Sequence, residues 1–325
     1  MNNTLRFSPS EVDLAGQINS HPHYFQSQSR IKSLIDHYLS FEELHDRLRD
    51  LPIQFEKPQP RPWKFINWQA INRSQILGID PNVFLAIIAG AIDTEAPIRG
   101  YTQTSRQYLE NLHPQLARFV GGTVAENGDL LELGLWEKEE RQHTPALLKV
   151  YFHLTGEKIT PTLRTARGYQ PTDDPYQDLY RHGLHRVVTE YGATCLYLWL
   201  MAHTTGPLQA VLEELVRDEI NHMAKFWGFG VWAFPASSLI QIGHTLMQTL
   251  KLNLMHKNTH SNLIYTLLRM RGVLNWEAWS LSNKVTFVFT LIRIMYRLWC
   301  WSNRLTLEYL QQLFGVPPAR TEPMG

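Results

Sequence analysis

Apolar residues recur at helical spacing along most of the chain, separated by polar, proline-rich and glycine-rich stretches. This periodicity predicts a mainly helical protein. Asp80 followed by Pro81 is a typical helix start, because Asp can cap the first turn and Pro fits the first helical position. The expected helices cover residues 28–50, a stretch from Pro81 that Pro97 and Gly100 kink just past Glu95, about 130–154, about 178–202, and a stretch that begins at the Gly206-Pro207 turn, antiparallel to the one before it.

The breaks between these stretches suggest three regions of one domain. Four prolines between residues 52 and 65 predict an irregular strap over the surface. Residues 157–176 are rich in Pro, Thr and Gly and are expected to link two helices. The expected regions are an N-terminal helix and strap in residues 1–79, a four-helix core in residues 80–232, and basic, aromatic-rich helices in residues 233–325.

Length, net charge and cysteine content limit the fold class, the partners and the cellular compartment that can be expected for this protein. The 325 residues suit one large all-α domain with a sizeable core. A net charge of +1 argues against general nucleic-acid binding, so no nucleic-acid partner is expected. The two cysteines, Cys195 and Cys300, offer no disulfide framework and favour a reducing, cytoplasmic compartment. Residues 1–7 lack the apolar core of a signal peptide, and the most apolar stretch, 223–240, is interpreted as the end of a buried helix.

The most informative chemical pattern is Glu-x-x-His with a second acidic residue directly before the Glu. It occurs twice. Positions i and i+3 lie on one face of a helix, so each Glu and His can hold one metal from the same side. A metal-bound His also needs a carboxylate or carbonyl on its other ring nitrogen. The two copies are Glu139-Glu140-Arg141-Gln142-His143 and Asp218-Glu219-Ile220-Asn221-His222.

The acidic residue before each motif is placed to support the His of the other motif. From its position, Asp218 can reach His143, and Glu139 can reach His222. Both motifs also lie on apolar stripes of their helices. Because a buried carboxylate without a partner is costly, two apolar faces that each carry Glu and His favour a metal over ordinary buried hydrogen bonds.

Two further Glu-x-x-His matches are set aside on physical grounds. Glu42 and His45 lie in a charged stretch typical of a solvated helix face. His113 precedes a proline, which disfavours helix at His113 and separates it from Glu110. Neither match has an acidic residue directly before its Glu.

Single glutamates on apolar helices supply the remaining candidate ligands. Glu95 follows a long apolar run that begins near Phe84, and Glu190 lies in another helix that is expected to face the core. Along the chain, a single Glu is followed by a Glu/His pair, and this order then repeats. Such an order matches the ligand set of a carboxylate-bridged di-iron site inside a four-helix bundle.

On these residues the chain resembles the soluble ferritin-like di-iron oxidases, and most closely the acyl-acyl-carrier-protein desaturases. The resemblance covers roughly residues 80 to 230. Residues 136–156 resemble the second ligand helix of that family, and residues 218–222 resemble the fourth. Thr94-Glu95-Ala96-Pro97 resembles the first, in which a Pro also follows the ligand Glu.

The resemblance implies an oxygen-dependent oxidase that removes hydrogens from a long acyl or other lipid chain. It implies two iron ions with O2 as co-substrate, a ferredoxin-like electron donor, a substrate presented by acyl carrier protein, and a homodimer. Glu140 and Glu219 are expected to bridge the irons, His143 and His222 to take one iron each, and Thr194 to handle protons at the oxygen site. The expected metal ligands are Glu95, Glu140, His143, Glu190, Glu219 and His222, with Glu139 and Asp218 as their outer partners.

Departures from the desaturase pattern leave other outcomes open. Gln142 and Asn221 stand where desaturases usually carry Arg. Ala193 stands where they tend to place a Thr, and Thr194 one step later is more like the bacterial multicomponent hydroxylases. A di-iron monooxygenase on a hydrophobic substrate is therefore an alternative, and manganese or a mixed Mn/Fe pair would accept the same ligands. Outside enzymes, an iron-binding ferroxidase or a scaffold of the same fold remains open.

The region after residue 245 differs in charge from the rest of the chain. It carries nine Lys and Arg residues against three Glu residues, and aromatic residues alternate with the bases within 284–304. Three interpretations compete. They are helices packed on the bundle with arginines extended to water, a docking face for acidic acyl carrier protein, and a helix at a membrane surface, which would make the protein peripheral to a membrane.

Overall fold

The computed structural model describes residues 24–162, 171–235 and 274–317, and these are predominantly helical. The predicted all-α class is confirmed. In the described residues, strands are confined to a short antiparallel hairpin formed by β1 (Thr123–Val124) and β2 (Leu130–Glu132). Predictions for residues 1–7, for 236–240, and for Lys251, Lys257, Arg269, Arg271 and Arg320 lie outside the described residues.

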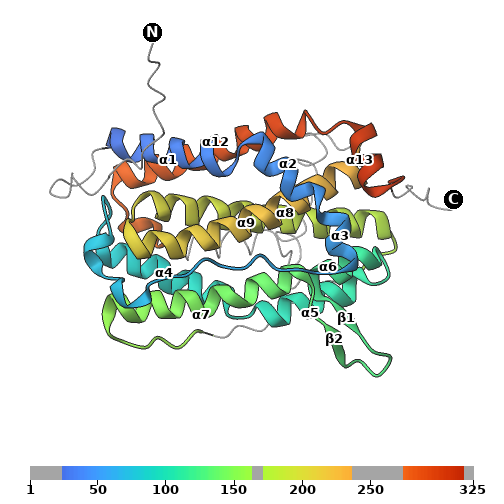
Figure 1. Ribbon diagram of the computed structural model, residues 1–325, viewed down its shortest axis with the longest axis horizontal. Helices are drawn as coiled ribbons and strands as arrows, with labels where there is room; N and C mark the ends of the chain where they lie inside the picture. The colour runs from blue at the N-terminus through green and yellow to red at the C-terminus, as the bar shows by residue number, and fades with distance from the viewer. Residues whose placement is uncertain (1–23, 163–170, 236–273, 318–325) are drawn as a thin grey trace, which may run out of the picture.

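Long helices run along the longest axis of the molecule in three tiers (Figure 1). The two longest described helices, α8 and α9, form the central tier and pack against each other along their length. On one side of them lie α4 and α7, and on the other side lie α1 and α12. Their bounds are α1 Tyr24–Tyr38, α4 Pro81–Glu95, α7 Leu135–Thr155, α8 Pro175–Ala202, α9 Gly206–Ala233 and α12 Leu281–Ser302.

Shorter elements connect and cover these tiers. The helix α2 packs on α9, and α3 packs on α6, which in turn contacts α5 and α7. The hairpin projects from one end of the molecule in Figure 1. The bounds are α2 Phe41–Arg49, α3 Leu51–Glu56, η2 Trp68–Ala70, η3 Arg73–Gln75, α5 Ile98–Leu109, α6 Pro114–Gly121, η4 Trp276–Ala278 and α13 Leu307–Phe314.

Two predicted helix starts are confirmed. The Asp80 side chain accepts hydrogen bonds from the backbone N–H groups of Asn82 and Val83, so it caps α4 as expected for Asp before Pro. The helix α9 begins at Gly206, which adopts the left-handed φ of +58°. Only three residues separate it from the end of α8, and this short turn makes the two helices antiparallel neighbours.

Other predicted boundaries were wrong. The stretch 28–50 is two helices, because Ser40 takes an extended conformation and caps α2 by accepting from the Glu43 N–H. The expected kink after Glu95 is a break: α4 ends at Glu95, and Pro97 is the cap residue before α5.

The starts of α7, α8 and the strap also differ from the predicted ones. Residues 130–132 form β2, so α7 starts only at Leu135, while α8 starts at Pro175, where Asp174 caps it. The predicted strap is helical at its start, as α3, and is irregular from 57 to 67.

The close packing of α2 on α9 depends on a glycine, which has no side chain. A Cβ added at Gly228 would lie 2.4 Å from the Leu48 Cδ1 atom, well inside van der Waals contact. Leu48 is fully buried, so it has little room to move away. Gly228 therefore sets how closely these two helices approach each other.

The described part of the basic region packs on the rest of the domain. The helix α12 contacts α1 and α8, and α13 contacts α9. Arg293 and Arg297 both reach Asp36 of α1, and the Arg304 guanidinium lies 3.8 Å from the ring centre of Phe41. The packing fits the first of the three interpretations for this region, but these arginines contact groups of the chain in place of extending to water. Among the described helices, none is both long enough and apolar enough to cross a membrane.

Candidate metal centre

Four helices bring the predicted ligands together in the interior. Glu95 is the last residue of α4, Glu190 lies on α8, and the two Glu/His pairs lie on α7 and α9. All six side chains are buried, and none is more than 7% exposed. The repeated order of single glutamate and Glu/His pair therefore corresponds to four helices around one buried cluster.

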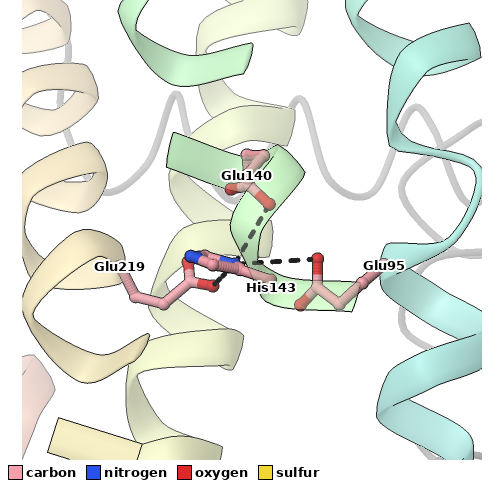
Figure 2. A group of neighbouring side chains, drawn as sticks. All are labelled: Glu95, Glu140, His143 and Glu219. Atoms are coloured by element: carbon pink, nitrogen blue, oxygen red, sulfur yellow. Dashed lines mark ion pairs between the residues drawn. The ribbon is translucent and has the colours of Figure 1, made fainter. Parts of the chain in front are cut away.

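Figure 2 shows the first group of ligands, which surrounds His143. The His143 Nδ1 atom lies 3.4 Å from Glu140 Oε2, 3.3 Å from Glu219 Oε1 and 4.0 Å from Glu95 Oε2. One ligand atom from each of these four residues lies within 4.8 Å of the others. Three carboxylates and one imidazole thus converge on a space that one metal ion can fill.

The second group mirrors the first around His222. The His222 Nδ1 atom lies 3.2 Å from Glu140 Oε1 and 3.4 Å from Glu190 Oε2. Together with Glu219, these residues also offer ligand atoms within 4.8 Å of one another. The ring centres of His143 and His222 are 6.4 Å apart, so the two groups are adjacent.

Glu140 and Glu219 belong to both groups, as bridging ligands must. Glu140 presents Oε2 to His143 and Oε1 to His222. A carboxylate in this position can bind two metal ions at once, one through each oxygen. The geometry brings together every residue that the sequence predicts as a ligand, while the binding of metal by these residues stays a prediction.

The two imidazoles are oriented for metal binding through Nδ1. Each Nδ1 atom is buried and makes no hydrogen bond of acceptable geometry. On the other side of the ring, His222 Nε2 lies 2.8 Å from Glu139 Oε2, and His143 Nε2 lies 3.4 Å from Asp218 Oδ2. Because a carboxylate accepts, these contacts hold a proton on Nε2, so Nδ1 is the atom that can bind a metal once it has lost its own proton. The residues therefore fit a two-metal centre.

Both cross-helix contacts were expected from the sequence. They connect α7 with α9 in both directions, from the acid before one motif to the His of the other. Their role as outer partners of a metal centre stays a prediction.

The electrostatics of the cluster indicate a shortage of positive charge. Burial and the neighbouring Glu140 raise the pKa of Glu95 to about 8, and the same causes raise the pKa of Glu219 well above its ordinary value. Burial alone would lower the pKa of His143 and His222, but the surrounding carboxylates raise both pKa values well above the ordinary value. The cluster thus attracts protons, and divalent cations would balance the same negative charge.

The irregular strap supplies partners that the sequence did not reveal. The backbone N–H of Arg61 donates to Glu139 at 3.0 Å, and its guanidinium donates to Asp218 at 2.8 Å and also pairs with Glu214. The Trp63 indole N–H donates to Asp218 at 2.8 Å. The strap therefore holds both carboxylates that orient the imidazoles. Nothing local in its sequence indicates this, because the contacts span 78 to 157 residues along the chain.

A second network surrounds Glu139 on the α9 side. Asn221 donates its amide N–H to Glu139 at 3.1 Å and accepts from the Lys225 ammonium at 2.5 Å. Lys225 is fully buried and also lies 2.6 Å from a carboxylate oxygen of Asp50. Asn221, which departs from the desaturase pattern, thus connects the imidazole of His222 to a buried ammonium.

Two side chains of α8 complete the surroundings. The Tyr197 hydroxyl donates to Glu95 at 2.7 Å and is fully buried, and sequence reasoning did not find it although it lies seven residues after Glu190. Thr194 is buried, and its hydroxyl has no hydrogen-bond partner among the described residues. Its proposed role in proton handling stays a prediction.

The two Glu-x-x-His matches that were set aside do not join the cluster. Glu42 is exposed on α2. The His113 Nδ1 atom accepts from the Leu116 N–H and caps α6, and Glu110 pairs with Arg106.

Comparisons with protein-family models, curated proteins and solved structures find no match to this chain.

Proposed function

We propose that this protein is an oxygen-dependent di-iron oxidase of ferritin-like fold. The observation that carries the proposal is the pair of four-residue groups that share Glu140 and Glu219. Four helices contribute a single Glu, a pair, a single Glu and a pair, which is the arrangement of di-iron carboxylate bundles. No other feature of the described residues gathers so many metal-binding side chains in one buried place.

The chemistry of the ligand set favours iron. It offers four carboxylates and two imidazoles and no thiolate, and such oxygen and nitrogen ligands suit a metal that changes oxidation state and coordination. Carboxylates can shift between terminal and bridging positions as the metal charge changes. Two bound iron ions would supply the redox chemistry by which O2 attacks an unactivated C–H bond.

The residues around the ligands hold them in place and control their protons. Glu139 and Asp218 fix the tautomer of the two imidazoles, and the strap residue Arg61 holds both of these carboxylates. Tyr197 donates a hydrogen bond to Glu95 and so steadies its charged form. These contacts preorganise the ligands before the metal binds.

The contacts of Trp63 support a proposed route for electrons. Trp63 is partly exposed, donates to Asp218, and lies 6.3 Å from the His143 ring between ring centres. Asp218 in turn contacts His143. A ferredoxin-like donor, the partner implied by the resemblance, would approach the surface at Trp63.

The proposed substrate is a long acyl or other lipid chain, and this part rests on the resemblance of the two motif helices. Desaturation and hydroxylation would use the same ligands. The buried Thr194 hydroxyl, which lies four residues after Glu190 and has no hydrogen-bond partner in the part of the chain that the structure describes, supports hydroxylation as the second candidate.

The proposed function is tested by identifying the product of the complete reaction. Iron-loaded protein is incubated with O2, a reduced ferredoxin system and acyl chains, either free or on acyl carrier protein, and the acyl mass is measured. Loss of two hydrogens supports desaturation, and gain of one oxygen supports hydroxylation. A Glu140→Ala variant should consume no O2 above background, whereas Glu213→Gln, a carboxylate change on α9 outside the cluster, should behave as wild type. Equal O2 consumption by wild type and Glu140→Ala would contradict the proposal.

A further inference from the structure

The helix α12 has two apolar faces, and the described residues cover only one of them. One face packs on α1 and α8 and buries Phe287, Ile294 and Leu298. The opposite face holds six large apolar side chains that are between 41% and 77% exposed. We call these six residues the α12 seam; they are Leu281, Val285, Val288, Ile292, Met295 and Trp299.

The seam has the spacing of a coiled-coil contact. Successive members are separated by four, three, four, three and four residues, which is the alternation of a and d positions in a heptad. On this pattern the a positions are Val285, Ile292 and Trp299, and the d positions are Leu281, Val288 and Met295. Spacing of this kind places one continuous stripe along about five turns of helix.

The spacing also reads the same in both directions. It is symmetric about the level of residue 290, so a second α12 that runs antiparallel meets the seam with the same spacing. Such self-matching is the property of an isologous contact between two copies related by a two-fold axis.

The exposed area is enough for a specific contact. With Tyr296, which is 60% exposed beside the seam, the exposed fractions amount to about 700 Å² if a large side chain offers about 200 Å². A standard protein interface buries about 800 Å² on each partner. An apolar patch of this size on the surface of a single chain usually marks an interaction site.

We propose that the α12 seam binds the α12 seam of a second copy of this chain, with the two helices antiparallel. Leu281 then faces the partner's Trp299, Val285 faces the partner's Met295, and Val288 faces the partner's Ile292. Small side chains meet large ones, so the helices stay evenly separated. A parallel pair would instead set Trp299 against the partner's Trp299 and valine against valine.

The charges near the seam also favour a second copy. The seam itself carries no charge, so two copies meet without repulsion along it. Arg293 and Arg297 are directed to Asp36 on α1, and the Lys284 ammonium lies 5.9 Å from the ring centre of Trp276. The described bases of α12 thus each have a contact within the chain.

The oligomeric state of the full chain tests this contact directly. Sedimentation at micromolar concentration should give a dimer for wild type and a monomer for the double variant Val288→Glu, Ile292→Glu, which places four carboxylates at the centre of the pair. Both residues point outward, so circular dichroism should be unchanged. The matched control is the double variant Leu130→Glu, Leu131→Glu, which adds the same two charges per chain at residues of the hairpin that are 49% and 69% exposed, and it should stay dimeric.

Other outcomes would overturn the proposal. These are a monomeric wild type, or a double variant that still forms dimers. If the wild type is monomeric and the double variant loses binding to vesicles of anionic phospholipid, the seam is a membrane-contacting face instead. The test does not depend on the metal centre, because it measures mass and not activity.

Crosslinking tests the antiparallel direction. With Cys300→Ser as background, chains carrying Val285→Cys are mixed with chains carrying Met295→Cys and are oxidised. The antiparallel pair predicts a disulfide in the mixture and none with either chain alone. Crosslinking of Val285→Cys chains with one another would show a parallel pair and overturn the assignment.

Discussion

The Glu139 carboxylate on α7 lies 2.8 Å from the Nε2 atom of His222 on α9. Glu139 directly precedes a predicted ligand, so one turn of α7 both offers a ligand and orients the imidazole of the facing helix. The reverse contact, from Asp218 to His143, makes the two motifs hold each other. This reciprocity explains why an acidic residue precedes the Glu in both motifs.

Glu139→Gln should weaken metal binding while the protein stays folded. Glu139 accepts from Arg61 N–H, Asn221 and His222, and an amide with a single oxygen leaves at least one of these donors without an acceptor. Loss of such an outer partner typically lowers metal affinity about 10- to 100-fold. Competition with a chelator of known affinity measures the change. Glu213→Gln on α9 is the control, and equal affinities in the two variants would show that Glu139 does not support the metal.

Arg61→Ala should destabilise the fold by about 3–5 kcal/mol, because it leaves the buried carboxylates of Asp218 and Glu214 without their cation. Lys64→Ala is the matched control on the same strap. Its ion pair with Glu213 is solvated, since Lys64 is 65% exposed, and its loss should cost less than about 1 kcal/mol. Urea unfolding measures the free energy of unfolding of both variants. Similar decreases for the two variants would contradict the role given to Arg61.

Metal binding should release protons, and the number should fall as the pH rises through about 8. Burial and Glu140 raise the pKa of Glu95 to about 8, so in metal-free protein Glu95 is protonated at neutral pH and must lose its proton to bind a metal. For a raised carboxyl pKa, the stability that Glu95 gives the metal-free fold is full below its ordinary pKa and is lost as the pH rises towards 8.

Titration calorimetry in buffers of different ionisation enthalpy counts the released protons. Near neutral pH, Glu95→Gln should release fewer protons per metal than wild type, because the amide does not titrate. The difference should vanish well above pH 8. A difference that is the same at both pH values would refute the assignment of the raised pKa to Glu95.

Gly228→Ala should destabilise the packing of α2 on α9 by about 1–3 kcal/mol, because the added methyl group overlaps Leu48. Leu48→Ala alone should cost about 2–5 kcal/mol by leaving a cavity. The double variant should cost less than the sum, since the smaller side chain makes room for the methyl group. Strict additivity in thermal or urea unfolding would mean that the two residues do not limit each other.

The sequence was sufficient for the parts of the site that follow helical spacing. Glu140 with His143 and Glu219 with His222 are each three residues apart, and this places each pair on one face. Glu95 and Glu190 could be identified because a lone acid in an apolar helix needs a partner. The same reasoning placed Asp218 and Glu139 against the opposite imidazoles.

Contacts made by irregular segments could not be predicted in this way. Arg61 and Trp63 lie in a strap with no periodicity, and their partners are about 80 to 160 residues away. Tyr197 fits an apolar helix face equally well as a core residue. The break inside the stretch 28–50 was missed because the apolar pattern continues across Ser40, although Ser is a good cap.

The most direct test of the account is the metal content of the intact chain. Protein loaded with Fe(II) without oxygen and freed of unbound metal should hold two irons per chain by mass spectrometry of the digested sample. His222→Ala should hold about one, since the group around His143 stays complete, and Glu213→Gln should hold two. Wild-type protein without stoichiometric iron, or His222→Ala with undiminished iron, would contradict the di-iron assignment and make the buried Glu/His pairs structural.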